Sequence, residues 1–103
     1  MLTGAQTASA AEDFCVAFDV MRRGEMVGQP TAGSTGQPLF VPLPGGGTLR
    51  VCTMRATYPD GREFVGVGVR PDLVVDETVG DARTGRDTAL EAALGRLKER
   101  RAK

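Results

Sequence analysis

Apolar residues recur at helical spacing in two parts of the chain, one near each end. Phe14, Phe18 and Met21 follow the i, i+4, i+7 spacing of one helix face and predict a helix from Ser9 to Arg22. A second helix is predicted to begin near Thr88, with the hydroxyl of that residue as its cap. The buried stripe expected on this second helix consists of Leu90, Ala93, Leu94 and Leu97.

Between the helical segments the pattern is typical of short strands separated by turns. A brief strand is expected over 25–28, and a last one over 73–75. The segments 39–43 and 48–57 are β-rich and flank a Pro-Gly-Gly-Gly turn at 44–47, which predicts a hairpin. The order helix, strands, helix predicts a mixed α/β domain whose sheet is mostly antiparallel.

Composition limits the function classes. A chain of 103 residues is long enough for one small domain, and its 13 basic and 13 acidic residues balance, which argues against nucleic-acid partners and anionic membranes. We expect no membrane span and no signal peptide. With no histidine and two distant cysteines, Cys15 and Cys52, no metal site and no cofactor are expected. Both cysteines lie in apolar patterns and are predicted to be buried thiols.

Four ordered motifs carry a resemblance to a known family. They are Ser-Ala-Ala-Glu at 9–12, Gly-x-Pro-Thr-x-Gly at 28–33, a Leu-Pro-Gly turn at 43–47, and the pair 58–62 and 68–72 with their Pro-Asp sequences. Together they resemble the catalytic core of the S41 serine peptidases, which include the tail-specific (C-terminal processing) and tricorn-type proteases. The resemblance implies a hydrolase that cleaves peptide or protein substrates through an acyl-enzyme.

The resemblance also implies a fold and a place within a larger protein. The expected fold is a crotonase/ClpP-like αββ half-core with an N-terminal helix and a C-terminal helix. Residues 1–103 would then be a C-terminal fragment of the catalytic domain, lacking the N-terminal half of the core. Members of this family suggest a bacterial cell envelope or secreted location. A core cut in this way would expose apolar surface and strand edges, so self-association is expected.

The same resemblance assigns roles to individual residues. Ser9 corresponds to the nucleophile, and the backbone N–H of Ala10 to one oxyanion donor. Gly33 and Ser34 would border the site, with Ser34 in the position where the tail-specific branch has its lysine base. The tricorn-type branch instead uses a histidine from the N-terminal half, with Glu63 here as a candidate helper acid.

Structural interpretations of these residues stay open at this point. Ser9 has the spacing of an ordinary capping-box serine, Ser34 of a turn residue, and Glu63 of an exposed hairpin residue. Because the chain has neither histidine nor the lysine at position 34, the isolated chain is expected to be inactive. The alternative function is a non-catalytic domain of the same fold that binds an apolar ligand or a peptide.

Overall fold

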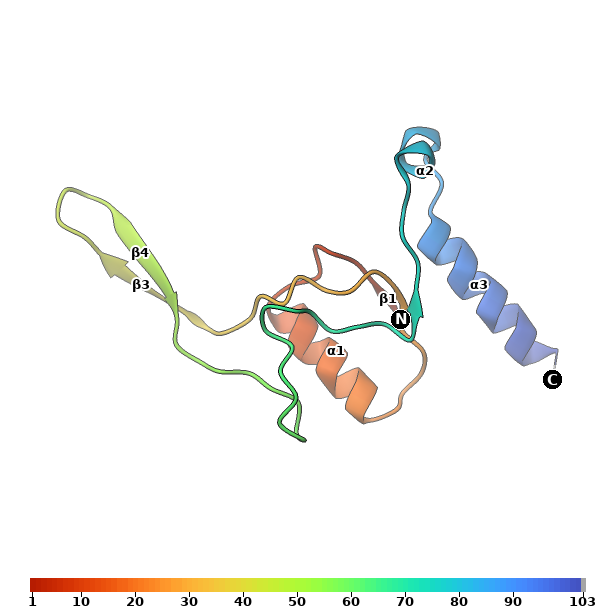
Figure 1. The fold of residues 1–103 in the computed structure, drawn as a ribbon, viewed down its shortest axis with the longest axis horizontal. Helices are drawn as coiled ribbons and strands as arrows, with labels where there is room; N and C mark the ends of the chain where they lie inside the picture. Colours follow the sequence, from red (N-terminus) through yellow and green to blue (C-terminus); the bar gives the residue numbers. More distant parts are fainter. Residues whose placement is uncertain (103) are drawn as a thin grey trace.

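A computed structural model describes residues 1–102 of the protein. Figure 1 shows the helix α1 beside a small sheet in the middle of the molecule, a hairpin that projects to one side, and two helices at the opposite end. The elements in chain order are β1 (Leu2–Thr3), α1 (Ala10–Val20), β2 (Val27–Gly28), β3 (Pro38–Pro42), β4 (Thr48–Cys52), β5 (Leu73–Val74), α2 (Val79–Thr84) and α3 (Thr88–Arg101).

The sheet beside α1 is parallel, which corrects part of the sequence prediction. Its order is β1-β2-β5, with Leu2 opposite Val27 and Val27 opposite Leu73. The helix α1 connects β1 to β2, and a crossover of this kind brings two strands together in the same direction. Antiparallel strand pairing is found in the hairpin β3–β4, so the expectation of a mostly antiparallel sheet fails for the strands that adjoin α1.

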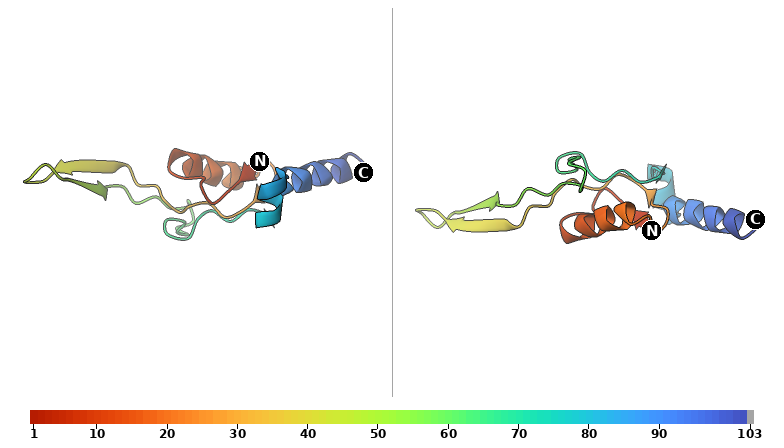
Figure 2. Two further views of the ribbon diagram at one scale, coloured as in Figure 1. Left: turned by 90° about the horizontal axis from the view of Figure 1, so that it is seen from above. Right: turned by 90° about the horizontal axis from the view of Figure 1, so that it is seen from below.

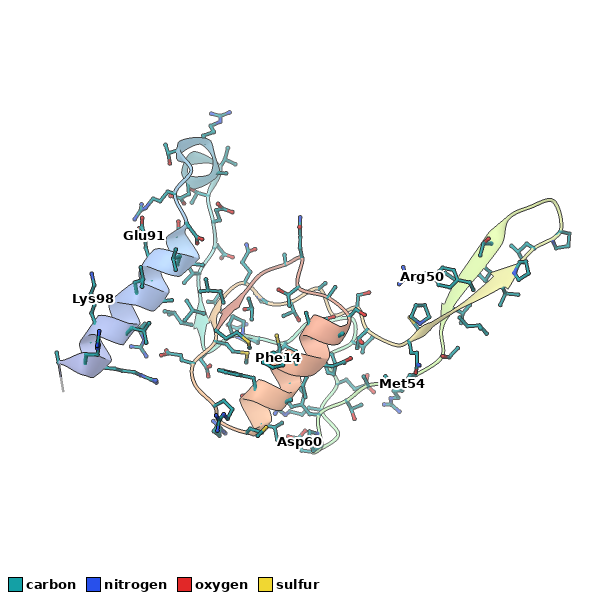
Figure 3. All side chains as sticks on the ribbon, turned by 180° about the vertical axis from the view of Figure 1, so that it is seen from behind. Phe14, Arg50, Met54, Asp60, Glu91 and Lys98 are labelled. Carbon is teal, nitrogen blue, oxygen red and sulfur yellow. The ribbon has the colours of Figure 1, made fainter. Side chains whose placement is uncertain are left out.

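The buried face of α1 is not the face that the spacing of phenylalanines predicts. Cys15 and Val16 are buried, whereas Phe14 is 62% exposed and Met21 66% exposed. Phe18 is partly buried against the core. The helix has apolar residues on more than one side, and the side with Cys15 and Val16 packs inward; Figure 3 labels Phe14 on α1.

A small apolar core lies beneath that inner face. Its buried members are Cys15, Val16, Met26, Tyr58, Phe64 and Val69. Tyr58 meets Phe64 edge to face, with ring centroids 6.0 Å apart. The core therefore joins α1 to the segment 58–69, which has little regular secondary structure.

The helix α3 is capped and packed differently from the prediction. Its N-cap is Asp87, whose carboxylate accepts a hydrogen bond from the Leu90 N–H at 2.9 Å, so the prediction of Thr88 as the cap was one residue late. The helix contacts β1 and β2, and Arg96 pairs with Glu25 at 2.8 Å. The expected buried stripe is wrong for its leucines, of which Leu97 is 57% exposed.

The hairpin β3–β4 is exposed along its length, apart from the half-buried Pro38. Its register places Leu39 opposite Val51 and Val41 opposite Leu49, which gathers these four aliphatic side chains on one face. Cys52, at the end of β4, is exposed rather than buried as predicted. The strand also ends at this residue, five short of the predicted end.

The molecule is a flat, elongated slab, as the two views in Figure 2 show. Its extents are 61 × 38 × 15 Å, and its Cα radius of gyration is 17.1 Å. A compact domain of this length would have a radius of gyration of about 13 Å. Much apolar surface therefore stays uncovered in this chain.

Candidate functional site

Ser9 occupies a strained turn between β1 and α1. It is the N-cap of α1 and has φ 59° and ψ −131°, which is a backbone conformation that residues other than glycine rarely adopt. Ser9 and Glu12 face each other as a capping box, in which the Glu12 carboxylate accepts from the Ser9 N–H. The Ser9 hydroxyl itself makes no capping hydrogen bond, and the Glu12 N–H donates to the Ser9 carbonyl oxygen at 2.8 Å. Such strain is concentrated at active sites, and a strained turn before a helix is one way to present a nucleophile.

The carboxylate of Glu12 is the polar centre of the site. The side chain is fully buried and accepts hydrogen bonds from four donors. The Ser9 N–H and the Ser34 N–H donate to Oε2 at 3.2 and 2.7 Å. The Thr31 hydroxyl and the Gly33 N–H donate to Oε1 at 2.5 and 2.6 Å. All four partners are donors, which is the arrangement an ionised carboxylate requires because it can only accept.

The loop that carries Gly33 and Ser34 is thereby held against the start of α1. The Ser9 N–H also donates to the carbonyl oxygen of Ser34 at 2.8 Å. Gly33 has φ +68°, and a Cβ there would lie 2.7 Å from the amide nitrogen of Gly68. Glycine at position 33 is therefore required by both backbone conformation and the close approach of the neighbouring chain.

The segment around Gly68 completes the same structure from the other side. A Cβ on Gly68 would lie 2.1 Å from the Thr31 carbonyl oxygen, so this glycine marks a close backbone approach. The Thr31 hydroxyl accepts a hydrogen bond from the Val69 N–H at 2.7 Å while it donates to Glu12. One buried threonine thus joins three segments of the chain.

Ala10 and Ser34 adjoin Ser9, whereas Glu63 has other partners. Ala10 is the first residue of α1, where backbone N–H groups have no acceptor within the helix and can hold a developing negative charge. Glu63 is exposed, forms an ion pair with Arg55, and belongs to an isolated bridge with Thr57. The contacts of Glu63 therefore do not include Ser9, and its role as a helper acid stays a prediction.

Cys15 lies on the buried side of α1, one turn after Glu12. Burial, followed by the charge of Glu12, raises the pKa of the Cys15 thiol above its ordinary value. Residues 1–102 contain no group of three or more histidine, cysteine or acidic side chains arranged to hold a metal ion. Within the same residues, no helix is long and apolar enough to span a membrane.

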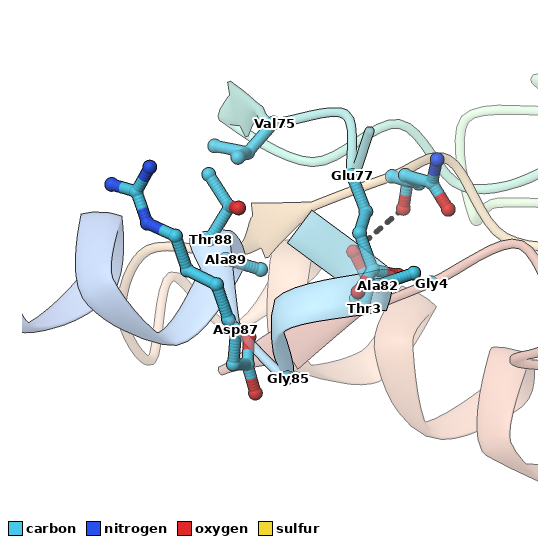
Figure 4. A pocket seen from close by; sticks show the side chains of 11 residues that line it. Thr3, Gly4, Val75, Glu77, Ala82, Gly85, Asp87, Thr88 and Ala89 are labelled. Atoms are coloured by element: carbon cyan, nitrogen blue, oxygen red, sulfur yellow. Dashed lines mark hydrogen bonds between the residues drawn. The ribbon is translucent and has the colours of Figure 1, made fainter. Parts of the chain in front are cut away.

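A separate cavity lies where the parallel strands end. It has a volume of about 350 Å³ and is lined by the residues that follow β1, β2 and β5, namely Gly4, Gln29 and Val75, together with the start of α3. Figure 4 shows it from close by, with the hydrogen bond from the Thr3 hydroxyl to the Gln29 carbonyl oxygen, which is 2.9 Å long. None of the residues that the sequence proposed for the site lines this cavity.

Two residues of the site were not recognised from the sequence as functional. Glu12 was interpreted only as half of a capping box, and Thr31 only as part of a loop motif. The available signal was the combination of a glutamate three residues after Ser9 with a Gly-rich loop, since such loops provide free backbone N–H groups that need an acceptor.

Known proteins are similar to this chain over most of its length. The chain is 30% identical over 90 residues to a carboxy-terminal-processing protease of Bartonella bacilliformis. This alignment covers 87% of this chain and 21% of that protein. The crystal structure of a putative peptidase from Parabacteroides merdae is similar with a TM-score of 0.80 and 31% identity, over 93% of this chain and 30% of the other. The tricorn protease shares the fold, with a TM-score of 0.79 and 23% identity over 96% of this chain and 10% of the other.

The chain therefore spans less than a third of the length of these relatives. The sequence model of peptidase family S41 matches residues 1–75, which include Ser9, Glu12 and the loop 31–34. The part matched ends after β5, before α2 and α3. The chain belongs to peptidase family S41.

Proposed function

We propose that this chain supplies the nucleophile segment of a serine endopeptidase that hydrolyses peptide bonds through an acyl-enzyme. The Ser9 hydroxyl attacks the carbonyl carbon of the scissile bond while a general base accepts its proton. The Ala10 N–H donates to the oxyanion of the tetrahedral intermediate. The amine then leaves with a proton, and water releases the acyl group from Ser9 by the reverse sequence of proton transfers.

The observation that carries this proposal is the backbone of Ser9. Its positive φ and its free hydroxyl lie directly before the first turn of α1, and S41 membership supports the role of nucleophile. Residues that cap helices without further function seldom need a strained backbone. The cost of the strained Ser9 backbone is offset by the hydrogen bonds of the buried Glu12 carboxylate, one of which is donated by the Ser9 N–H.

The general base is proposed to lie outside this chain. Among all 103 residues there is no histidine, and Ser34 cannot accept a proton at neutral pH. The uncovered faces of α1 and of the hairpin β3–β4 support a core that is completed by a further part of the protein, and the matched relative is several times longer than this chain. Glu63 would orient the base after exchanging its ion pair with Arg55.

The test is hydrolysis of unstructured peptides by the full-length protein and its Ser9→Ala variant. We expect Ser9→Ala to abolish hydrolysis and to leave the fold intact, because the hydroxyl makes no capping hydrogen bond. The 103-residue chain alone should be inactive. Activity of Ser9→Ala within about threefold of wild type, which is less than 1 kcal/mol in activation free energy, would remove Ser9 from the role of nucleophile.

A second candidate function is binding without cleavage. The aliphatic face of the hairpin favours it, since Leu39, Val41, Leu49 and Val51 are all exposed. On this hypothesis the full-length protein would bind an apolar ligand or a peptide and have no base near Ser9. Binding of an unstructured peptide with no hydrolysis over a long incubation would favour this candidate.

A further inference from the structure

The carboxylate of Glu12 has no basic partner although it is fully buried. Among residues 1–102 the ion pairs of the structure do not include Glu12, and its hydrogen-bond donors are three backbone N–H groups and one hydroxyl. Burial of a carboxylate without a cation is costly unless its hydrogen bonds are fully made. The Glu12 carboxylate therefore occupies a buried position at which an apolar side chain would avoid the cost of burying a charge.

The donors belong to the two segments that form the proposed site. One is the amide of Ser9 itself, and the others come from the loop that begins at Thr31 and ends at Ser34. The Ser9 amide is shared, because it also donates to the Ser34 carbonyl oxygen at 2.8 Å. The carboxylate thus fixes the peptide plane that precedes the Ser9 side chain, and so restrains the strained φ of that residue.

Thr31 extends the hydrogen-bond network of Glu12 to a third segment of the chain. Its hydroxyl lies between Glu12 Oε1, to which it donates, and the Val69 N–H, from which it accepts. Hydrogen bonds in such a chain polarise one another, and their removal affects more than one pair. Loss of the Glu12 carboxylate should therefore weaken the hydrogen bonds at Ser9, in the loop 31–34 and at residue 69 together.

We propose that Glu12 is a positioning residue for the nucleophile, which holds Ser9 and the loop 31–34 in one fixed arrangement without touching substrate. This inference rests on the proposed function of Ser9. It predicts that loss of the carboxylate, with size and shape conserved, will release the backbone of Ser9. Glu12→Gln is the appropriate variant, because its amide group presents a donor to amides that also donate.

The first experiment measures amide hydrogen exchange by NMR in the 103-residue chain. We expect Glu12→Gln to accelerate exchange at Ser9, Gly33 and Ser34 by about tenfold or more, a factor that corresponds to about 1.4 kcal/mol of local protection. Thr3→Val is the matched control, because it removes another buried hydroxyl, which donates to the Gln29 carbonyl oxygen. Equal acceleration in both variants, or none in Glu12→Gln, would overturn the proposal.

A second variant keeps the test decisive where Glu12→Gln does not fold. Thr31→Val retains the carboxylate and the volume of the side chain but removes the hydroxyl between Glu12 and the Val69 N–H. We expect faster exchange at Val69 and Gly33 with the chain still folded. Unchanged exchange at both amides would contradict a connected network.

The second experiment concerns chemistry and uses the full-length protein. We expect Glu12→Gln to lower kcat for peptide hydrolysis by about tenfold or more with KM nearly unchanged, since no substrate contact is lost. Thr3→Val should leave kcat within about twofold. A parallel loss in both variants would reduce Glu12 to a structural role. An inactive wild-type protein would refute the proposed function, while the exchange experiment would still decide whether Glu12 holds Ser9.

Discussion

The segments around Glu12 and the hairpin β3–β4 are stabilised in opposite ways. Around Glu12, a buried carboxylate, a buried threonine and six buried apolar residues join α1 to the segments 31–35 and 58–69. In the hairpin, every residue of both strands except the half-buried Pro38 is exposed, and the backbone ladder from Pro38 to Cys52 is the regular interaction that joins them. An isolated two-stranded hairpin is marginally stable in water.

This difference separates a region whose side chains find their partners within the described residues from a region whose apolar side chains do not. The turn at Ser9 has its hydrogen-bond partners within residues 1–102, so its geometry is built locally. The hairpin presents an aliphatic face without a partner in the same residues. We therefore expect the hairpin, and the exposed Phe14 side of α1, to be covered in the full-length protein or by self-association of the isolated chain.

Stability should differ most strongly between variants at one phenylalanine from each region. Phe64 is 2% exposed and Phe40 60% exposed. Phe64→Ala should lower the free energy of unfolding by about 3–5 kcal/mol, or abolish the cooperative transition, because it empties the core. Phe40→Ala should change it by about 0.5 kcal/mol or less. Urea denaturation measures both, and similar losses would show that the hairpin is as well packed as the core.

The next contrast uses two glycines of the same loop. Gly66 and Gly68 have φ values of +86° and +84°, but a Cβ would meet nothing within 4 Å at Gly66 and would lie 2.1 Å from the Thr31 carbonyl oxygen at Gly68. Each alanine substitution costs about 1–2 kcal/mol for the positive φ. Gly68→Ala should cost about 1–3 kcal/mol more, from the backbone clash. Equal costs would mean that the loop is not pressed against Thr31.

A smaller contribution to stability is expected from the raised pKa of Tyr58, the one tyrosine of the chain. Burial, and then a hydrogen bond with the Asp19 carboxylate, raises the pKa of Tyr58 to about 12. The folded value lies above the unfolded value of about 10, so this contribution to stability is present below pH 10 and is lost as pH rises from about 10 to 12. Tyrosinate absorbance measures it, with Asp19→Asn expected to lower the pKa; native titration near 10 would contradict burial.

The smallest effect on the fold is expected from modification of thiols. Cys52 is exposed, whereas Cys15 is buried and its pKa is raised. Since the thiolate is the reactive form, a disulfide reagent at pH 8 should modify Cys52 quickly and Cys15 only after denaturant is added. Circular dichroism should not change when Cys52 alone is modified. Reaction of both thiols at one rate in the native chain would contradict the separation of the two regions.

The sequence was sufficient for the elements with local signals. The start of α1 directly after Ser9 and the hairpin follow from capping spacing and turn residues, and both are present. The buried face of α1 was not predictable from spacing, because Phe14 and Cys15 lie on different apolar sides and tertiary packing selected the second. The parallel sheet was missed because β1, β2 and β5 have two residues each, which is too short for a periodic pattern.

The candidate site was predictable where its residues lie in local motifs, and not where they depend on distant contacts. Ser9, Ala10, Gly33 and Ser34 followed from ordered motifs, and the structure places them at one turn and its adjoining loop. The buried state of Glu12 depends on donors about twenty residues away, at Thr31 and Gly33. Sequence spacing within a helix cannot report such a contact.

The role of Ser9 as nucleophile is tested by covalent labelling of the full-length protein with a fluorophosphonate, followed by mass spectrometry of its peptides. A serine in a strained turn with an external base should give one adduct, on Ser9, which disappears in Ser9→Ala. The 103-residue chain, which lacks histidine, should remain unlabelled. An adduct on another serine such as Ser34, or peptide hydrolysis that persists in Ser9→Ala, would contradict Ser9 as the nucleophile.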